Sequence, residues 1–170
     1  ADIAAVVSAF GTRAVKAATW AEWEAALGAE PTPILVLMPH NDDGQGALEV
    51  AGEFLRRGRI EAPYVTGGHA GLAPAVLLLG CDTAGSKSDP AGYATRFMAC
   101  GAGVVFSTFT PVLASDAAQV AKRLASALVD EQRPEMPAAD VLRAVRAAAI
   151  RDGFPVALAV TAYGDADWTV

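Results

Sequence analysis

The apolar run AVLLLG occupies residues 75–80, and Cys81 follows it directly. A second run, ILVLMP, occupies residues 34–39 and is followed directly by His40. Continuous apolar runs of this length are typical of strands that are buried on both faces of a parallel sheet. Open α/β sheets place their functional sites beyond the carboxyl ends of such strands. The two runs therefore predict an α/β fold in which Cys81 and His40 share one edge of the sheet.

Cys81 and His40 are the residue types of a thiol–imidazole dyad. A free thiol has a pKa of about 8.5, so little of it is thiolate at neutral pH, and a neighbouring imidazole can accept its proton. Two plainer interpretations exist: Cys81 as a small buried hydrophobic residue and His40 as an ordinary loop histidine. The sequence pattern alone leaves both open.

The composition indicates one globular domain over residues 1–170, because 53% of the residues are hydrophobic and can form a sizeable core. The net charge is −6 and the densest basic cluster is RRGR at residues 56–59, which argues against nucleic acid as a partner. No apolar run approaches the roughly 20 residues of a membrane span, and no signal-peptide pattern is present. We expect a cytoplasmic protein without a membrane partner.

Two cysteines do not form a disulfide framework, and the spacing of Cys81 and Cys100 matches no common zinc motif. We therefore expect no metal and no cofactor. Cys100 ends a helical stretch and is expected in the core. The pair Asp42–Asp43 beside His40 is either a solvated loop or an acidic pair that faces a metal or the substrate. The chain contains no G-x-S-x-G elbow, no P-loop and no H-E-x-x-H motif, and the G-x-G at residues 101–103 precedes a strand rather than following it.

Helical and strand patterns alternate along the chain, which predicts a mostly parallel sheet covered by helices. A capping box at residues 19–22 begins one helix, and a similar pattern at 116–119 begins another. The expected helices are 3–10, 19–28, 47–57, 90–99, 116–129 and 137–152. The expected strands are 13–16, 34–38, 60–65, 75–80, 103–108 and 155–162.

The order of these motifs resembles the CHAT-type peptidases, which are bacterial caspase-like cysteine proteases of the caspase/separase clan. The resemblance rests on the histidine strand, on VLLLGCDTAG at residues 76–85, and on YATRFMACGAGVVFST at residues 93–108. The sequence TPV at residues 110–112 stands where the family usually has Trp-Pro-Val, and residues 156–165 are similar to its closing strand. The likeness covers most of the chain.

The resemblance implies a caspase-like fold and a cysteine endopeptidase that cleaves a peptide or protein substrate. Cys81 would be the nucleophile, His40 the general base and acid, and the backbone N–H groups of Asn41 and Cys81 the oxyanion hole. The family usually has glycine after the histidine. Asn41 stands there instead, and asparagine is the residue that best replaces glycine in a left-handed turn.

Two acidic residues are candidates for the substrate pocket. Asp82 follows the nucleophile and either faces the substrate or orders its loop. Relatives that cleave after basic residues usually have an acid just beyond Trp-Pro-Val, where this chain has Leu113 and Ala114. Asp116 lies slightly later and is either a helix cap or the base of the pocket. Cleavage specificity does not follow from the sequence.

The family fold begins with a central strand, whereas residues 3–10 have a helical pattern and the chain lacks an initiator Met. We therefore expect a fragment of a larger protein, whose missing strand comes from an upstream segment or a partner chain. Two alternatives to a peptidase stay open. One is a catalytically inactive caspase-like domain for protein binding or signalling, and the other is an unrelated doubly wound ligand-binding domain.

Overall fold

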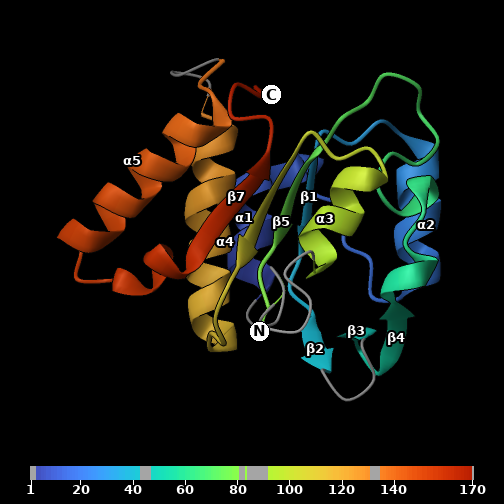
Figure 1. The fold of residues 1–170 in the computed structure, drawn as a ribbon, viewed down its shortest axis with the longest axis horizontal. Helices are drawn as coiled ribbons and strands as arrows, with labels where there is room; N and C mark the ends of the chain where they lie inside the picture. Colours follow the sequence, from blue (N-terminus) through green and yellow to red (C-terminus); the bar gives the residue numbers. More distant parts are fainter. Residues whose placement is uncertain (1–2, 43–46, 81–82, 84–91, 131–134, 170) are drawn as a thin grey trace.

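The computed structural model describes residues 3–42, 47–80, 83, 92–130 and 135–169. At its centre is a four-stranded sheet with the strand order β1-β5-β6-β7 (Figure 1). Strands β1, β5 and β6 are parallel, and β7 is antiparallel to β6. The strands are β1 (Ile34–Leu37), β5 (Ala75–Leu78), β6 (Val104–Thr108) and β7 (Val160–Gly164). The prediction of an α/β fold with a mostly parallel sheet is confirmed.

Helices cover both faces of this sheet. Because side chains alternate along a strand, Ala75 and Leu77 face one hydrophobic core while Val76 and Leu78 face another. The first core contains α1 (Ile3–Phe10), α4 (Ala114–Leu128) and α5 (Ala138–Arg151). The second contains α2 (Trp20–Ala29) and α3 (Gly92–Ala99). The predicted helical sandwich is therefore confirmed, and it is consistent with a caspase-like architecture.

The predicted capping box begins α2. Thr19 Oγ1 accepts a hydrogen bond from the Glu22 N–H at 3.1 Å, and Glu22 Oε2 accepts one from the Ala18 N–H at 2.7 Å. The Trp20 N–H donates to Glu53 Oε2 at 2.9 Å. Because the first N–H groups of a helix have no partner inside it, these side chains fix where α2 starts.

Residues 47–57 form a β-hairpin, so the predicted helix there is wrong. Strand β3 (Ala47–Val50) and strand β4 (Glu53–Arg56) are joined by Ala51 and Gly52, whose φ angles are +52° and +85°. Two consecutive left-handed residues cannot continue an α-helix, and they match the twist of a two-residue hairpin.

The hairpin is anchored by one pair of side chains. Leu48 pairs with Leu55, and both are buried in the core on the α2 face. Strand β2 (His40–Asp42) pairs with β3 and completes a small antiparallel sheet, which lies beyond the end of β1 (Figure 1). The segment that was expected to be a helix therefore forms a platform beside the carboxyl end of β1.

Three predicted strands also differ from the structure. Residues 13–16 are not a strand, since Gly11–Arg13 is a 3-10 turn and Val15 is 80% exposed. Ala62–Tyr64 is a 3-10 turn instead of a strand. The last strand starts only at Val160, after a 3-10 turn at Pro155–Ala159. Proline stands in each of the last two turns, where it lacks the N–H that a strand ladder requires.

The C-terminal segment folds back onto the start of α5. The Trp168 carbonyl accepts a hydrogen bond from the Ala138 N–H at 2.8 Å, and the Ala166 carbonyl accepts one from the Ala139 N–H at 3.1 Å. The Trp168 indole N–H donates to the Ala73 carbonyl at 2.7 Å. This segment thus caps α5 and also contacts the loop that enters β5. Within the described ranges, no helix has the length and apolar character to cross a bilayer.

Candidate active site

The residues that precede His40 and Cys81 are in direct contact. Leu37 pairs with Leu78 in the parallel register of β1 and β5, and the Leu79 N–H donates to the Leu37 carbonyl at 2.9 Å. A Cβ atom added to Gly80 would overlap the carbonyl oxygen of Pro39. The two strands therefore stay adjacent up to the last residue before each predicted catalytic residue.

The backbone of His40 and Asn41 lies in β2, where His40 pairs with Glu49 and Asn41 pairs with Leu48. Among the described residues other than glycine, a left-handed φ occurs only at Ala51 and Glu135. The expected left-handed turn at Asn41 is therefore wrong. An extended backbone accommodates asparagine as readily as glycine, so the departure from the family at this position creates no conformational strain.

Cys81 and Asp82 lie outside the described residues, so the Cys81–His40 dyad and the pocket role of Asp82 stay predictions. Asp116 lies half-buried in the first turn of α4, which begins at Ala114. The N-cap is Leu113, which makes no side-chain capping hydrogen bond, so Asp116 is not the cap. Its carboxylate lies near the positive end of the helix dipole, which stabilises negative charge.

A cluster of three buried hydroxyl groups lies at the carboxyl ends of β5 and β6. Thr83 and Ser107 are fully buried, and Thr108 is 2% exposed. Thr83 Oγ1 donates to the Leu78 carbonyl at 2.7 Å and lies 2.9 Å from Ser107 Oγ. Thr108 Oγ1 donates to the carbonyl of Gly80. The cluster therefore donates hydrogen bonds to the carbonyls of the two residues that flank Leu79, just at and beyond the end of β5.

Counting hydrogens fixes the direction of these bonds. Each hydroxyl group has one hydrogen. The hydrogen of Thr83 goes to Leu78, and that of Thr108 goes to Gly80. Ser107 is therefore the donor toward Thr83. Thr83 Oγ1 and Thr108 Oγ1 lie 3.1 Å apart, but neither hydroxyl group has a hydrogen left for the other. We therefore interpret this contact as packing rather than as a hydrogen bond.

The remaining histidine and cysteine have structural contacts of their own. His69 Nε2 lies 3.0 Å from the Leu27 carbonyl at the end of α2. Cys100 Sγ donates to the Ile60 carbonyl at 3.2 Å. Burial raises the pKa of the Cys100 thiol, Arg96 partly opposes this rise, and Glu61 adds to it. Cys100 is half-buried and stays protonated at neutral pH, so it is a poor nucleophile.

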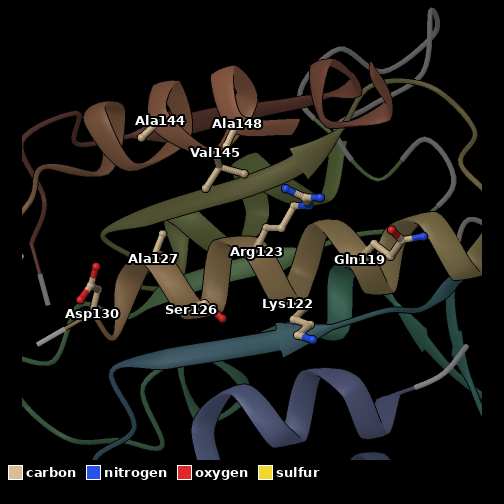
Figure 2. Close-up of a pocket in the computed structure, with 9 residues that line it drawn as sticks. All are labelled: Gln119, Lys122, Arg123, Ser126, Ala127, Asp130, Ala144, Val145 and Ala148. Atoms are coloured by element: carbon tan, nitrogen blue, oxygen red, sulfur yellow. The ribbon is translucent and has the colours of Figure 1, made fainter. Parts of the chain in front are cut away.

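A separate cavity of about 520 Å³ lies between α4 and α5 (Figure 2). Arg123 rises from α4 toward α5, where its guanidinium binds Asp152 at 2.7 Å and stacks over the Phe154 ring at 5.7 Å. None of the lining residues is a cysteine or histidine; they are Gln119, Lys122, Arg123, Ser126, Ala127, Asp130, Ala144, Val145 and Ala148. This cavity has no nucleophile of the predicted type. In the part of the chain that the structure describes, no three His, Cys, Asp or Glu side chains gather as a metal site.

The sequence pattern did not single out Thr83, Ser107, Thr108 or Gly80 as functional residues. A signal was nevertheless present, because Ser107 and Thr108 end an otherwise apolar strand and Thr83 follows the predicted nucleophile by two residues. Polar side chains at strand ends are recognisable in a sequence, whereas their mutual hydrogen bonds require the register of β5 and β6. Comparison with protein-family models and with curated proteins gives no match.

Proposed function

We propose that this chain is a cysteine endopeptidase in which Cys81 is the nucleophile and His40 is the general base and acid. The contact between Gly80 and Pro39 is the observation that carries the proposal. The register of β1 with β5 ends at Leu37 with Leu78, and a continuation by three residues would place His40 opposite Cys81. Neighbouring strands lie about 4.8 Å apart, which brings an imidazole within hydrogen-bonding reach of a thiol.

The proposed reaction follows from the two residue types. The imidazole of His40 accepts the Cys81 proton, and the thiolate forms a bond to the carbonyl carbon of the substrate. Backbone N–H groups of Asn41 and Cys81 donate to the oxyanion of the tetrahedral intermediate. The C–N bond then breaks, and the leaving amine takes the proton from His40. Water hydrolyses the thioester, which releases the carboxylic acid and restores the thiol. Asp82 and Asp116 stay candidates for contacts with the substrate.

We further infer that an additional strand pairs with β1. Among the described residues, β5 is the one strand that pairs with β1 in this sheet. The carbonyls of Pro33 and Leu37 accept hydrogen bonds from the β5 side. Because the bonding groups of a strand alternate between its two sides, the N–H and C=O groups of Ile34 and Val36 point the other way. An upstream segment or a partner chain would satisfy them.

The proposed function is tested with a peptide carrying an electrophilic acyl group, together with turnover on a peptide library. We expect wild type and Cys100→Ala to be labelled and to cleave peptides. Cys81→Ala should lose both properties, and His40→Gln should lose turnover, because each removes one half of the proton transfer. Cys100→Ala is the matched control, since it deletes the same atom from the other thiol.

Turnover by Cys81→Ala at the wild-type rate would contradict the nucleophile assignment. Peptide binding without turnover in wild type, when the added strand is present, would instead favour the inactive binding domain. A Cys81 sulfur that faces away from His40 in an experimental structure would exclude the dyad.

A further inference from the structure

We propose that Glu49 is a positioning residue for His40, acting on the imidazole from the neighbouring strand β3. The inference rests on the proposed peptidase chemistry, in which His40 carries the proton between the thiol and the leaving amine. Its support is the backbone register of the small sheet β2-β3-β4 together with the surroundings of the Glu49 side chain. Glu49 itself need not touch the substrate.

The pairing of β2 with β3 places the two residues opposite each other. His40 pairs with Glu49 and Asn41 pairs with Leu48 in an unbroken antiparallel register. Residues that pair in this way belong to the same face of a sheet, and their Cβ atoms are about 4.5–5.5 Å apart. A glutamate at one of these positions is therefore long enough to reach an imidazole at the other.

The core on the α2 face identifies which side of the small sheet this pair occupies. Leu48 and Leu55 pair across β3 and β4 and are buried in that core. Because successive residues of a strand belong to opposite faces, Glu49 lies on the other face, where it pairs with Phe54. Phe54 is 47% exposed, which agrees with this placement. The register position of His40 is thus on the face away from the core, as proton exchange with a substrate requires.

The surroundings of the Glu49 carboxylate fit this role. Its side chain is half-buried, and within the described ranges it forms no hydrogen bond and no ion pair. Glu53 of the same hairpin, by contrast, accepts the Trp20 N–H. A half-buried carboxylate without a partner has lost part of its hydration, and a cationic neighbour offsets that loss. An imidazolium at the opposite position of β2 is such a neighbour.

Other charged residues near this face stand farther from His40 than Glu49 does. Asp42 lies two residues later on β2, which is about 6.6 Å along the strand. Arg56 lies on β4, two strands away, and it is exposed, so water screens its charge. Asp43 lies outside the described residues. The directly opposite position therefore makes Glu49 the best-placed carboxylate, and Asp42 is the competitor that the test has to separate from it.

The chemical role follows from the two ring nitrogens of histidine. A carboxylate that accepts the N–H of one nitrogen fixes the tautomer, so the other nitrogen can accept the thiol proton. The same carboxylate stabilises the imidazolium that forms during the transfer and does not become protonated itself. The proton therefore moves from Cys81 to His40 and then to the leaving amine, while the negative charge of Glu49 stays in place.

The test titrates the two histidines by NMR in a Cys81→Ala background, where no thiol titrates together with the imidazole. Glu49→Gln keeps the shape of the side chain and removes its charge. We expect it to lower the proton affinity of His40 about tenfold, while the signals of His69 titrate as before. Glu53→Gln is the matched control and should leave both titrations unchanged. It removes the same charge from the opposite face of the hairpin and keeps a side-chain acceptor.

Turnover on a peptide library provides the second readout. Loss of the carboxylate from a Ser-His-Asp site lowers kcat by about 10,000-fold. Because Glu49 is only half-buried, we expect a smaller loss in Glu49→Gln, of about tenfold or more. KM should stay within about twofold, since the carboxylate acts on His40 rather than on the substrate. Glu49→Asp keeps the charge, so its kcat should lie between those of wild type and Glu49→Gln.

An unchanged His40 titration in Glu49→Gln would overturn the inference, even in an active enzyme. A larger shift in Asp42→Asn than in Glu49→Gln would also overturn it, because the partner of His40 would then be Asp42. Equal kcat in Glu49→Gln and wild type would have the same consequence. The expected shift in a chain whose wild type hydrolyses no peptide would support the contact and contradict the proposed function instead.

Discussion

The thiol of Cys100 donates to the Ile60 carbonyl from a half-buried position, and only the protonated thiol can do so. Burial raises the pKa of this thiol above its ordinary value, with Arg96 opposing the rise and Glu61 adding to it. A thiolate at this position would lose both its solvation and its hydrogen bond.

We therefore predict a shifted pH profile for alkylation of Cys100. In the folded protein the rate should rise at higher pH than in urea-unfolded chain, because the thiolate forms later. The folded state retains its proton longer, so this group stabilises the fold below the ordinary thiol pKa and loses that contribution as pH rises through the raised pKa. Mass spectrometry of iodoacetamide adducts between pH 6 and about 10 measures the profile. Coincident folded and unfolded curves would contradict it.

At the level of single residues, the sequence predicted the strand ends that precede His40 and Cys81 but not the hydroxyl cluster. A continuous apolar run identifies a buried strand by itself, since burial of both faces requires it. The bonds of Thr83 with Ser107 and of Thr108 with Gly80 join residues from separate strands. Only the pairing of β5 with β6 brings them together, and no local pattern contains that information.

Among the elements, the hairpin β3–β4 supports the part of the chain that contains His40. Its turn has Ala51 and Gly52 at φ +52° and +85°. A Cβ at Gly52 would meet no atom within 4 Å, so any cost of substitution there comes from the backbone rather than from packing.

We predict that Gly52→Val lowers the free energy of unfolding by about 1–2 kcal/mol, which is the cost of a left-handed residue with a side chain. Ala51→Gly is the matched control. Its relief of left-handed strain roughly offsets the greater freedom of glycine in the unfolded chain, so stability should change by less than about 0.5 kcal/mol. Urea denaturation monitored by circular dichroism measures both. Equal stability of Gly52→Val and wild type would contradict the turn geometry.

The hairpin also shows where the pattern of apolar residues is insufficient. Residues 47–57 contain apolar side chains that fit a helical stripe as well as an alternating strand. The deciding residues are Ala51 and Gly52, and alanine is not a usual hairpin residue. Its left-handed conformation is imposed by the pairing of Leu48 with Leu55 over the core on the α2 face. Tertiary packing therefore outweighs local propensity in this segment.

For the molecule as a whole, the consequential surface is the outer edge of β1. The N–H and C=O groups on the free side of an edge strand can pair with a strand of another chain. Natural edge strands usually carry charges or proline that prevent such pairing. Strand β1 has neither within Ile34–Leu37. The N–H of Val36 points away from β5, on the side where the proposed additional strand would bind.

We predict that the isolated chain associates in a concentration-dependent manner. It should gain activity when the upstream segment or partner chain that pairs with the outer edge of β1 is present. Val36→Pro should reduce this association, because proline removes one donor from the edge. Val36→Ala is the control, since it loses similar packing and keeps the N–H. Sedimentation velocity over a concentration series measures the effect. A strictly monomeric wild-type chain with full activity would contradict the proposal of an additional strand.

The fold-back of the C-terminal segment has a consequence for the order in which the polypeptide matures. The carbonyls of Ala166 and Trp168 cap the first turn of α5, yet they follow α5 in the chain. On the ribosome, α5 emerges while its cap is still inside the exit tunnel. The N–H groups of Ala138 and Ala139 therefore lack these two acceptors until the segment that contains Ala166 and Trp168 has left the tunnel. The Trp168 indole N–H also donates to the Ala73 carbonyl, so the segment that follows β7 contacts both α5 and the loop that enters β5.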